Sequence, residues 1–180
     1  EEIESLVKDY FEQVHYEQNF VPHISKVPVT GKVLFKEHLV NLVNSSLDMW
    51  LTAGEYTKSF EKSISKFLGN RHTLFVNSGS SANLLAISAV KKHFDCKDGD
   101  EVITSAVNFP TTLNPIIQNN LKPVLVDAEL DSYNIDANLI EKNITEKTKG
   151  IVLAHTLGNP FNLEKIMKIK EKYNLFLVED

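Results

Sequence analysis

The chain has 180 residues, a formal net charge of −5 and no basic run, which disfavours a nucleic-acid-binding surface because neutralising phosphates requires clustered Lys and Arg. Its hydrophobic content of 42% and charged content of 24% are typical of a soluble globular protein, and no apolar stretch approaches membrane-spanning length. The single cysteine, Cys96, excludes a disulfide or a four-cysteine iron–sulfur site within this chain and predicts a free thiol in a reducing cytoplasm.

Amphipathic helices are predicted before residue 71, because apolar residues recur there at helical spacing. The apolar stripes run over residues 3–14, 39–50 and 56–67. Gly69 follows the last stripe, where a left-handed C-terminal cap favours glycine. The segment 27–32 contains a proline and a glycine and is expected to form an irregular connection. Residues 1–70 are thus predicted to form an N-terminal helical segment.

From residue 72 onward, short apolar runs alternate with segments of helical length. The predicted strands span 73–76, 102–104, 123–127, 151–154 and 175–178. The predicted helices between them span 80–94, 111–119, 136–142 and 163–173. This alternation predicts an α/β fold with a mainly parallel sheet and helices on both faces, and continuously apolar strands are typical of such sheets. Because no helix follows the last strand, we expect residues 71–180 to be the first part of a larger domain.

Ligands of open α/β sheets bind outside the carboxyl ends of the strands, which selects candidate site residues. The segment 77–83 follows the first predicted strand and opens a helix, with Gly79 suited to a tight turn and Ser80 offering an amide and a hydroxyl. These groups could bind a phosphate, and a simple serine N-cap explains the same residues equally well. The segment matches neither GxGxxG nor GxxxxGK[ST].

The other predicted strand ends carry residues with two interpretations each. Phe109 could stack on a flat ring, although filling the space beneath the next helix is the simpler interpretation. Asp127 is better explained as a turn former than as a catalyst. His155 could act as an acid, a base or a hydrogen-bond donor, or could be structural. Asp180 could hold a protonated ring nitrogen of a cofactor, or could be a solvated acid.

Taken together, several segments in this order resemble the sugar aminotransferases and dehydrases of the DegT/DnrJ/EryC1/StrS family, which are fold-type I enzymes dependent on pyridoxal phosphate. The resemblance covers about residues 27–180 and rests on residues 50–54, 77–83, 99–103, 109–112, 123–127, 133–136, 155–159 and 178–180. Within the family it is closest to the CDP-4-dehydro-6-deoxyglucose 3-dehydrase enzymes of O-antigen synthesis. Residues 78–85, 109–112 and 154–159 look like that branch, and Ser80 and Leu157 stand where the aminotransferases tend to carry Thr and an aromatic residue.

The resemblance implies a role for each candidate residue. Gly79 and Ser80 would bind the phosphate of pyridoxal or pyridoxamine 5′-phosphate. Phe109 would stack on the pyridine ring, and Asp180 would hold the ring nitrogen. His155 and Asn159 (the latter from the same segment) would lie near the site, and no metal-binding residue is expected in this chain.

The resemblance also implies a reaction, in which the C3 hydroxyl of a 4-keto-6-deoxy sugar nucleotide is removed. In that branch a histidine replaces the Schiff-base lysine, and a 2Fe–2S cluster and a partner reductase deliver electrons. We expect these residues beyond Asp180, so this chain lacks the residue that separates a dehydrase from an aminotransferase and is expected to be inactive alone. The alternatives are a sugar aminotransferase and a non-catalytic nucleotide-binding domain, against which the absence of GxGxxG counts.

The expected assembly follows from the resemblance, and the expected location follows from the composition and from the absence of a membrane-spanning or signal-like stretch. Sites of this kind are built across a dimer interface, so the complete protein is expected to be a cytoplasmic homodimer without nucleic-acid or membrane partners. The segment 50–54 is the candidate interface, and burial in the core is its alternative interpretation.

Overall fold

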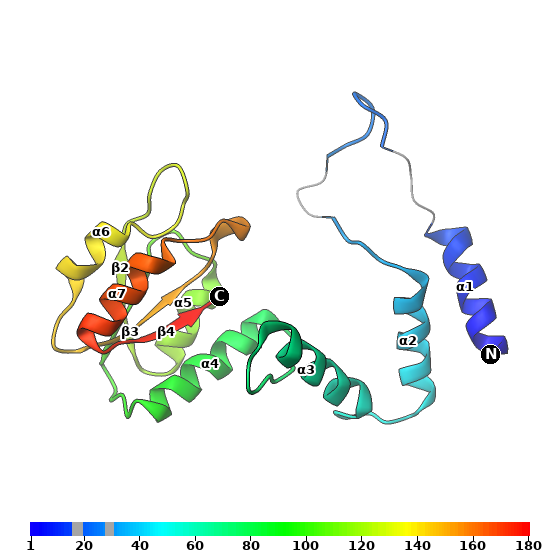
Figure 1. Cartoon of the computed structure of the whole chain (residues 1–180), viewed down its shortest axis with the longest axis horizontal. Helices are drawn as coiled ribbons and strands as arrows, with labels where there is room; N and C mark the ends of the chain where they lie inside the picture. Colours follow the sequence, from blue (N-terminus) through cyan, green and yellow to red (C-terminus); the bar gives the residue numbers. More distant parts are fainter. Residues whose placement is uncertain (16–19, 28–30) are drawn as a thin grey trace. The chain divides into compact units, whose positions relative to one another are not determined.

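The computed structural model describes residues 1–15, 20–27 and 31–180, and the chain divides into two compact units, Glu1–Phe75 and Val76–Asp180 (Figure 1). The connection predicted at 27–32 includes residues 28–30, which lie outside the described residues. Within the described residues, no helix combines the length and apolar composition needed to cross a bilayer.

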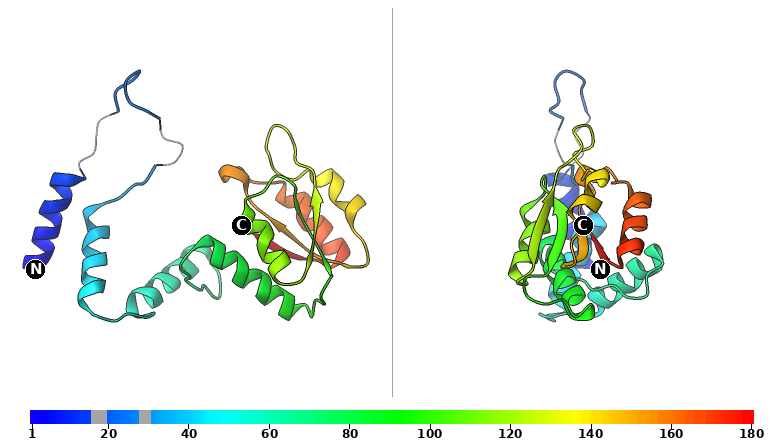
Figure 2. Two further views of the ribbon diagram at one scale, coloured as in Figure 1. Left: turned by 180° about the vertical axis from the view of Figure 1, so that it is seen from behind. Right: turned by 90° about the vertical axis from the view of Figure 1, so that its left-hand side faces the viewer.

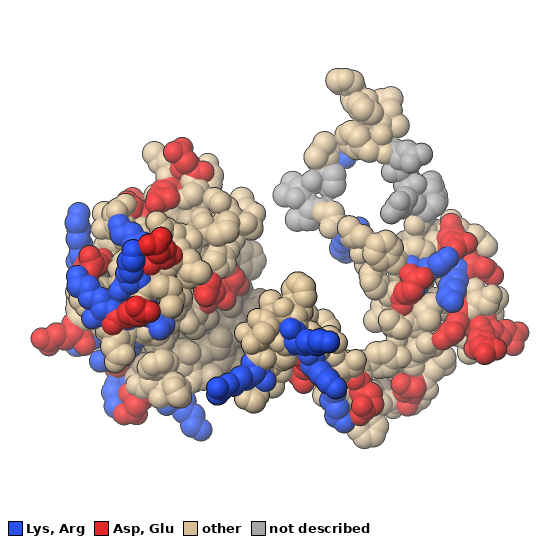
Figure 3. Space-filling view, viewed as in Figure 1, with Lys and Arg blue, Asp and Glu red and all other residues tan. Residues whose placement is uncertain are grey.

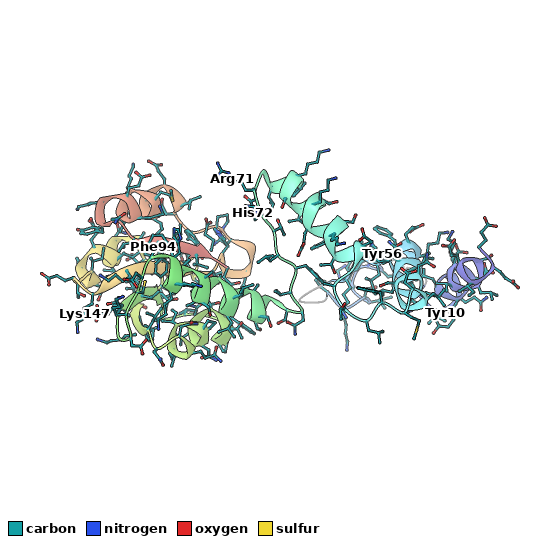
Figure 4. The ribbon with its side chains drawn as sticks, turned by 90° about the horizontal axis from the view of Figure 1, so that it is seen from below. Tyr10, Tyr56, Arg71, His72, Phe94 and Lys147 are labelled. Carbon is teal, nitrogen blue, oxygen red and sulfur yellow. The ribbon has the colours of Figure 1, made fainter. Side chains whose placement is uncertain are left out.

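The first unit contains the predicted helices. They are α1 (Glu2–Val14), α2 (Lys36–Leu47) and α3 (Glu55–Leu68). Gly69 ends α3 with a φ of 70°, which confirms the predicted left-handed cap. The α2 helix ends at Leu47, so Trp50 lies in the turn that follows, where its indole N–H donates to the Ala53 carbonyl at 3.0 Å. Much of the apolar surface of these helices is exposed, as at Tyr56 on α3 (Figure 4).

The prediction of a strand at residues 73–76 is wrong. These residues have no regular secondary structure, and none of the four strands of the sheet pairs with them. The Phe75 N–H instead donates to Glu61 Oε1 at 2.8 Å, and the Thr73 hydroxyl lies 2.7 Å from Ser65 Oγ. The residue types favour β structure, but a strand also requires a neighbour with which it exchanges backbone hydrogen bonds.

The second unit contains a parallel sheet of four strands in the order β2-β1-β3-β4 (Figure 2). The strands are β1 (Glu101–Ser105), β2 (Lys122–Val126), β3 (Thr148–Leu153) and β4 (Phe176–Glu179). The helices are α4 (Gly79–His93), α5 (Pro110–Gln118), α6 (Ala137–Ile140) and α7 (Leu163–Tyr173). The predicted parallel sheet with helices on both faces is confirmed, since α4 and α5 cover one face and α6 and α7 cover the other.

Successive residues along a strand point to opposite faces of the sheet, so β1, β3 and β4 each contribute to two hydrophobic clusters. On β1, Val102 belongs to the cluster of Ile87 and Ile116 from α4 and α5, whereas Ile103 belongs to the cluster of Ile166 from α7. All of these side chains are fully buried. The continuously apolar sequence of the strand therefore reflects burial on both faces.

The helix predicted at 136–142 is shorter than expected. Asp136 caps α6 by accepting a hydrogen bond from the Asn138 N–H at 2.8 Å, and the chain then tightens into a 3₁₀ turn, η1 (Glu141–Asn143). The remaining helices and strands of this unit are found where they were predicted, with ends shifted by a few residues.

Gly150 of β3 lies opposite Phe176 of β4 and faces its ring. A Cβ atom added to Gly150 would overlap the ring carbons of Phe176, so only glycine fits there. The Phe176 ring is 5.5 Å from the ring of Phe94, which follows α4 (Figure 4). Cys96 is a buried free thiol in the same cluster, and burial raises its pKa.

The strand order positions the site. From β1 the chain moves outward to β2, returns across β1 to β3 and continues to β4, so its direction reverses between β1 and β3. Ligands of open α/β sheets bind at such a reversal, beyond the carboxyl ends of the strands. Away from this edge, acidic and basic side chains are interspersed on the surface of the unit (Figure 3), as in the Lys168–Glu164 pair of α7 at 2.6 Å.

Candidate functional site

A cavity of about 440 Å³ lies at the carboxyl ends of β1, β3 and β4. Its walls come from the first turns of α4 and α5 and from the residues that follow β3 and β4. Gly79, Ser80, Phe109, His155 and Asp180 all line it, so the structure brings together five residues singled out from distant parts of the sequence.

The N-terminus of α4 forms one wall. Ser78 is the N-cap residue, and its hydroxyl accepts a hydrogen bond from the Ser81 N–H at 3.1 Å. The capping role therefore belongs to Ser78, and Gly79 and Ser80 are left exposed at the cavity. A Cβ atom at Gly79 would meet no heavy atom within 4 Å, so the space above this turn is open. The positive end of the helix dipole and these groups suit a phosphate.

Phe109 forms a second wall at the start of α5. Its backbone is extended at the N-cap position, and Pro110 begins the helix, where its fixed φ is favourable. The side chain is 67% exposed, so it does not fill the space beneath the helix. An exposed aromatic face at a cavity wall is available to stack on a flat ring.

Asp180 follows β4 and is held on both its backbone and its side chain. Its N–H donates to the Leu153 carbonyl at 2.8 Å, which continues the pairing of β4 with β3. Its Oδ2 accepts hydrogen bonds from Asn83 Nδ2 at 2.8 Å and from the Thr112 hydroxyl. A carboxylate fixed at the mouth of a parallel sheet can bind a cationic ring nitrogen.

Asn83 and Thr112 also line the cavity, but the sequence does not single them out as site residues. Asn83 lies one helical turn before Ile87, and both are buried on the same face of α4. A polar side chain in a buried stripe requires a hydrogen-bond partner, and this signal could have identified Asn83. Thr112 carries no such signal, because nothing local distinguishes it from Thr111.

His155 follows β3, and its ring is fixed from two sides. Its Nε2 lies 3.0 Å from Glu179 Oε2, and the ring stacks on Phe161 at a centroid distance of 4.2 Å with an interplanar angle of 5°. The Nδ1 atom is buried and has no hydrogen-bond partner among the described residues. The backbone N–H donates to the Asp180 carbonyl at 3.0 Å, so the two residues are joined directly.

Asn159 and Asp127 do not line the cavity. The side chain of Asn159 donates to the Ser132 carbonyl at 3.4 Å and is exposed, and Asn159 also accepts from Asn134 through its backbone. Asp127 accepts from the Ala128 N–H at 2.9 Å, as expected of a turn former.

The cavity therefore offers a helix N-terminus, an aromatic face and a fixed carboxylate. Together these groups fit a flat heteroaromatic ring that carries a phosphate and a positive charge.

Known proteins are similar to this chain in sequence and in structure. The lipopolysaccharide biosynthesis protein RfbH of Salmonella typhimurium is 50% identical to this chain over 100% of it and 42% of its own length. The dTDP-4-dehydro-2,6-dideoxy-D-glucose 3-dehydratase of Saccharopolyspora spinosa is 45% identical over 97% of this chain and 38% of its own length. The structure of E. coli GDP-4-keto-6-deoxy-D-mannose-3-dehydratase with bound hydrated PLP has 35% identity and a TM-score of 0.78, covering 88% of this chain and 41% of that one.

These matches fix the family and the fold, although the chain spans less than half the length of each of these relatives. The structural match confirms the predicted large-domain fold of fold-type I enzymes dependent on pyridoxal phosphate. The sequence profile of the DegT/DnrJ/EryC1/StrS aminotransferase family matches residues 34–180, and the chain belongs to this family.

Proposed function

We propose that the full-length protein is a nucleotide-sugar 3-dehydratase that uses pyridoxal or pyridoxamine 5′-phosphate to remove the C3 hydroxyl of a 4-keto-6-deoxy sugar nucleotide. The observation that carries the proposal is the cavity that joins Asp180, Phe109 and the first turn of α4. The relatives support the substrate class, because two of the three are 3-dehydratases of nucleotide sugars and the third is a lipopolysaccharide biosynthesis protein. A cytoplasmic role in dideoxysugar or O-antigen synthesis is part of the same proposal.

Each wall of the cavity would bind one part of the cofactor. Gly79 and Ser80 would bind the phosphate at the positive end of α4. Phe109 would stack on the pyridine ring, and Asp180 would hold the protonated ring nitrogen. His155 would contact the ligand from the side of β3. The bound cofactor would supply an electron sink for the bonds that change in the sugar.

The test uses the full-length protein with pyridoxamine phosphate, a reductase and 4-keto-6-deoxy sugar nucleotides, and follows the products by mass spectrometry. A dehydratase yields a sugar that has lost the C3 oxygen. A sugar with a new amino group, formed with an amino donor, contradicts the proposal and identifies an aminotransferase, the second candidate, which the family's description favours. Iron and sulfide analysis of the same protein tests for the 2Fe–2S cluster and its reductase partner.

Replacing Ser80 with Ala is expected to weaken binding of pyridoxal phosphate by about 1 kcal/mol, the net contribution of a typical hydrogen bond. Fluorescence titration of the full-length protein measures the change. Ser88→Ala is the matched control, because Ser88 lies on the same helix and its hydroxyl donates to the Leu84 carbonyl at 2.8 Å. Equal affinities of Ser80→Ala and the wild type would remove Ser80 from the phosphate site.

The full-length protein is expected to form a homodimer through the segment 50–54. Trp50 is 67% exposed and Leu51 is 86% exposed in this chain, so the segment presents an apolar surface suited to a partner. Light scattering should give the mass of a dimer, and Leu51→Glu should shift it toward the monomer. Leu130→Glu, at an equally exposed leucine in the other unit, is the control. A monomeric wild type contradicts this expectation.

A further inference from the structure

The Asp180 carboxylate is anchored by two buried side chains. Thr112 is 0% exposed and Asn83 is 7% exposed, and both donate to the same oxygen, Oδ2. Among the described residues, no side chain or backbone group donates to Oδ1 of Asp180. One carboxylate oxygen is therefore held by the protein, and the other is left for a ligand in the cavity that Asp180 lines.

The burial of these donors explains why they hold the carboxylate firmly. A buried amide or hydroxyl is costly unless it is hydrogen-bonded, and hydrogen bonds to an ionised group are stronger than neutral ones. The Asn83 amide satisfies its hydrogens with Asp180 and with the Thr111 carbonyl at 3.2 Å. Rotation of the Asp180 side chain would break both bonds to Oδ2, so the direction of the free oxygen is fixed.

The two donors also lie close to the other cavity walls. Asn83 is one helical turn beyond Ser80 on α4, and Thr112 is one turn beyond Phe109, to whose carbonyl its N–H donates at 3.0 Å. The helix that carries the phosphate turn and the helix that carries the aromatic wall thus each provide one donor to Asp180. The position of the carboxylate is therefore set relative to both walls.

We infer that Asn83 and Thr112 are positioning residues that keep the Asp180 carboxylate aligned with the ring nitrogen of the ligand. The inference rests on the proposed function, since the ring nitrogen is that of the proposed cofactor. The carboxylate stabilises a protonated ring nitrogen only when its free oxygen lies against that nitrogen, and the two hydrogen bonds to Oδ2 hold the carboxylate in one orientation. Residues that act in this way affect turnover through Asp180 and do not contact the sugar nucleotide.

The test measures kcat, KM and the pH dependence of the bound cofactor's absorbance in the full-length holoenzyme. Thr112→Val removes the hydroxyl at nearly constant volume and is expected to lower kcat roughly ten-fold, with KM for the sugar nucleotide unchanged. The absorbance transition that reports ring-nitrogen protonation should shift to lower pH. Thr112→Ser keeps the hydroxyl and should restore kcat to within about three-fold of the wild type. Asn83→Leu should act in the same direction as Thr112→Val.

Two comparisons separate positioning from a merely structural role. Combining Thr112→Val with Asp180→Asn should lower kcat little further, because both changes act through one carboxylate. Thr148→Val is the matched control: Thr148 is 6% exposed, and its hydroxyl accepts from the Thr145 N–H at 2.9 Å, at the opposite end of β3 from the cavity. This control should reduce thermal stability and leave kcat unchanged.

The outcomes distinguish the inference from the proposed function. A wild-type protein that binds no pyridoxal phosphate contradicts the proposed function, and the inference fails with it. A wild type that binds the cofactor, together with normal kcat in both Thr112→Val and Asn83→Leu, overturns the inference alone. The inference is also overturned if the fold-losses of kcat in Thr112→Val and Asp180→Asn multiply fully in the double variant.

Discussion

Replacing Asp180 with Asn in the full-length enzyme is expected to lower kcat by on the order of 100-fold, the scale at which removal of one electrostatic group acts in an enclosed site. The fold should persist, because the Asn carbonyl can accept the hydrogen bonds from Asn83 and Thr112 that reach Oδ2. The neutral amide cannot balance a protonated ring nitrogen, so the cofactor would lose its capacity to withdraw electrons.

Steady-state kinetics measures the loss of kcat, and circular dichroism measures whether the fold persists. Asp127→Asn is the matched control, because Asp127 also follows a strand and its carboxylate accepts a hydrogen bond from the neighbouring Ala128 N–H outside the cavity. This control should retain the kcat of the wild type. Near-normal turnover in Asp180→Asn would contradict the role assigned to the carboxylate, whereas a loss of the circular dichroism signal would reveal a structural role.

Replacing Gly150 with Ala is expected to destabilise the protein by about 1–3 kcal/mol, the usual cost of overpacking a core. The added methyl group would overlap the ring of Phe176, which is 1% exposed and packs against Phe94. The ring belongs to the hydrophobic cluster that also contains Val102 and Val152, so it cannot move without displacing these side chains. The methyl group must therefore force β3 and β4 apart or push the ring out of its position.

Chemical denaturation of the full-length protein, followed by tryptophan fluorescence and circular dichroism, measures this change in the free energy of unfolding. Gly31→Ala is the control, because a Cβ atom there meets no heavy atom of the described residues within 4 Å. Adding Phe176→Leu to Gly150→Ala should recover part of the lost stability by freeing space. An unchanged midpoint in Gly150→Ala would show that the cluster adapts without cost.

The sequence predicted the second unit well, because local patterns determine much of its architecture. Continuously apolar runs such as 102–104 indicated buried parallel strands, and the structure confirms them. The run 73–76 has the same character, yet it forms no strand because pairing depends on a partner that a local pattern does not reveal. The sequence also predicted too long a helix at 136–142, because no residue type there indicates that α6 ends at Ile140 and continues as the 3₁₀ turn η1.

The site was predictable to the extent that strand ends share one edge of the sheet. This rule placed Phe109, His155 and Asp180 together, and the structure finds them around one cavity. The resemblance added Asn159, but its side chain donates to the Ser132 carbonyl and the residue does not line the cavity. The bond of Asn83 to Asp180 spans 97 residues of sequence, so it depends on how α4 packs and could not be inferred from spacing.

The position of β4 at the edge of the sheet determines how its backbone exchanges hydrogen with the solvent. The N–H groups along a strand point alternately to its two sides, and that of Asp180 points to β3, where it donates to Leu153. Those of Leu177 and Glu179 therefore point to the outer side, where none of the described strands lies. In deuterated solvent these two amides would exchange fast and their neighbours slowly. Slow exchange at Leu177 and Glu179 in the full-length protein would thus reveal a segment lying along the strand that carries Asp180.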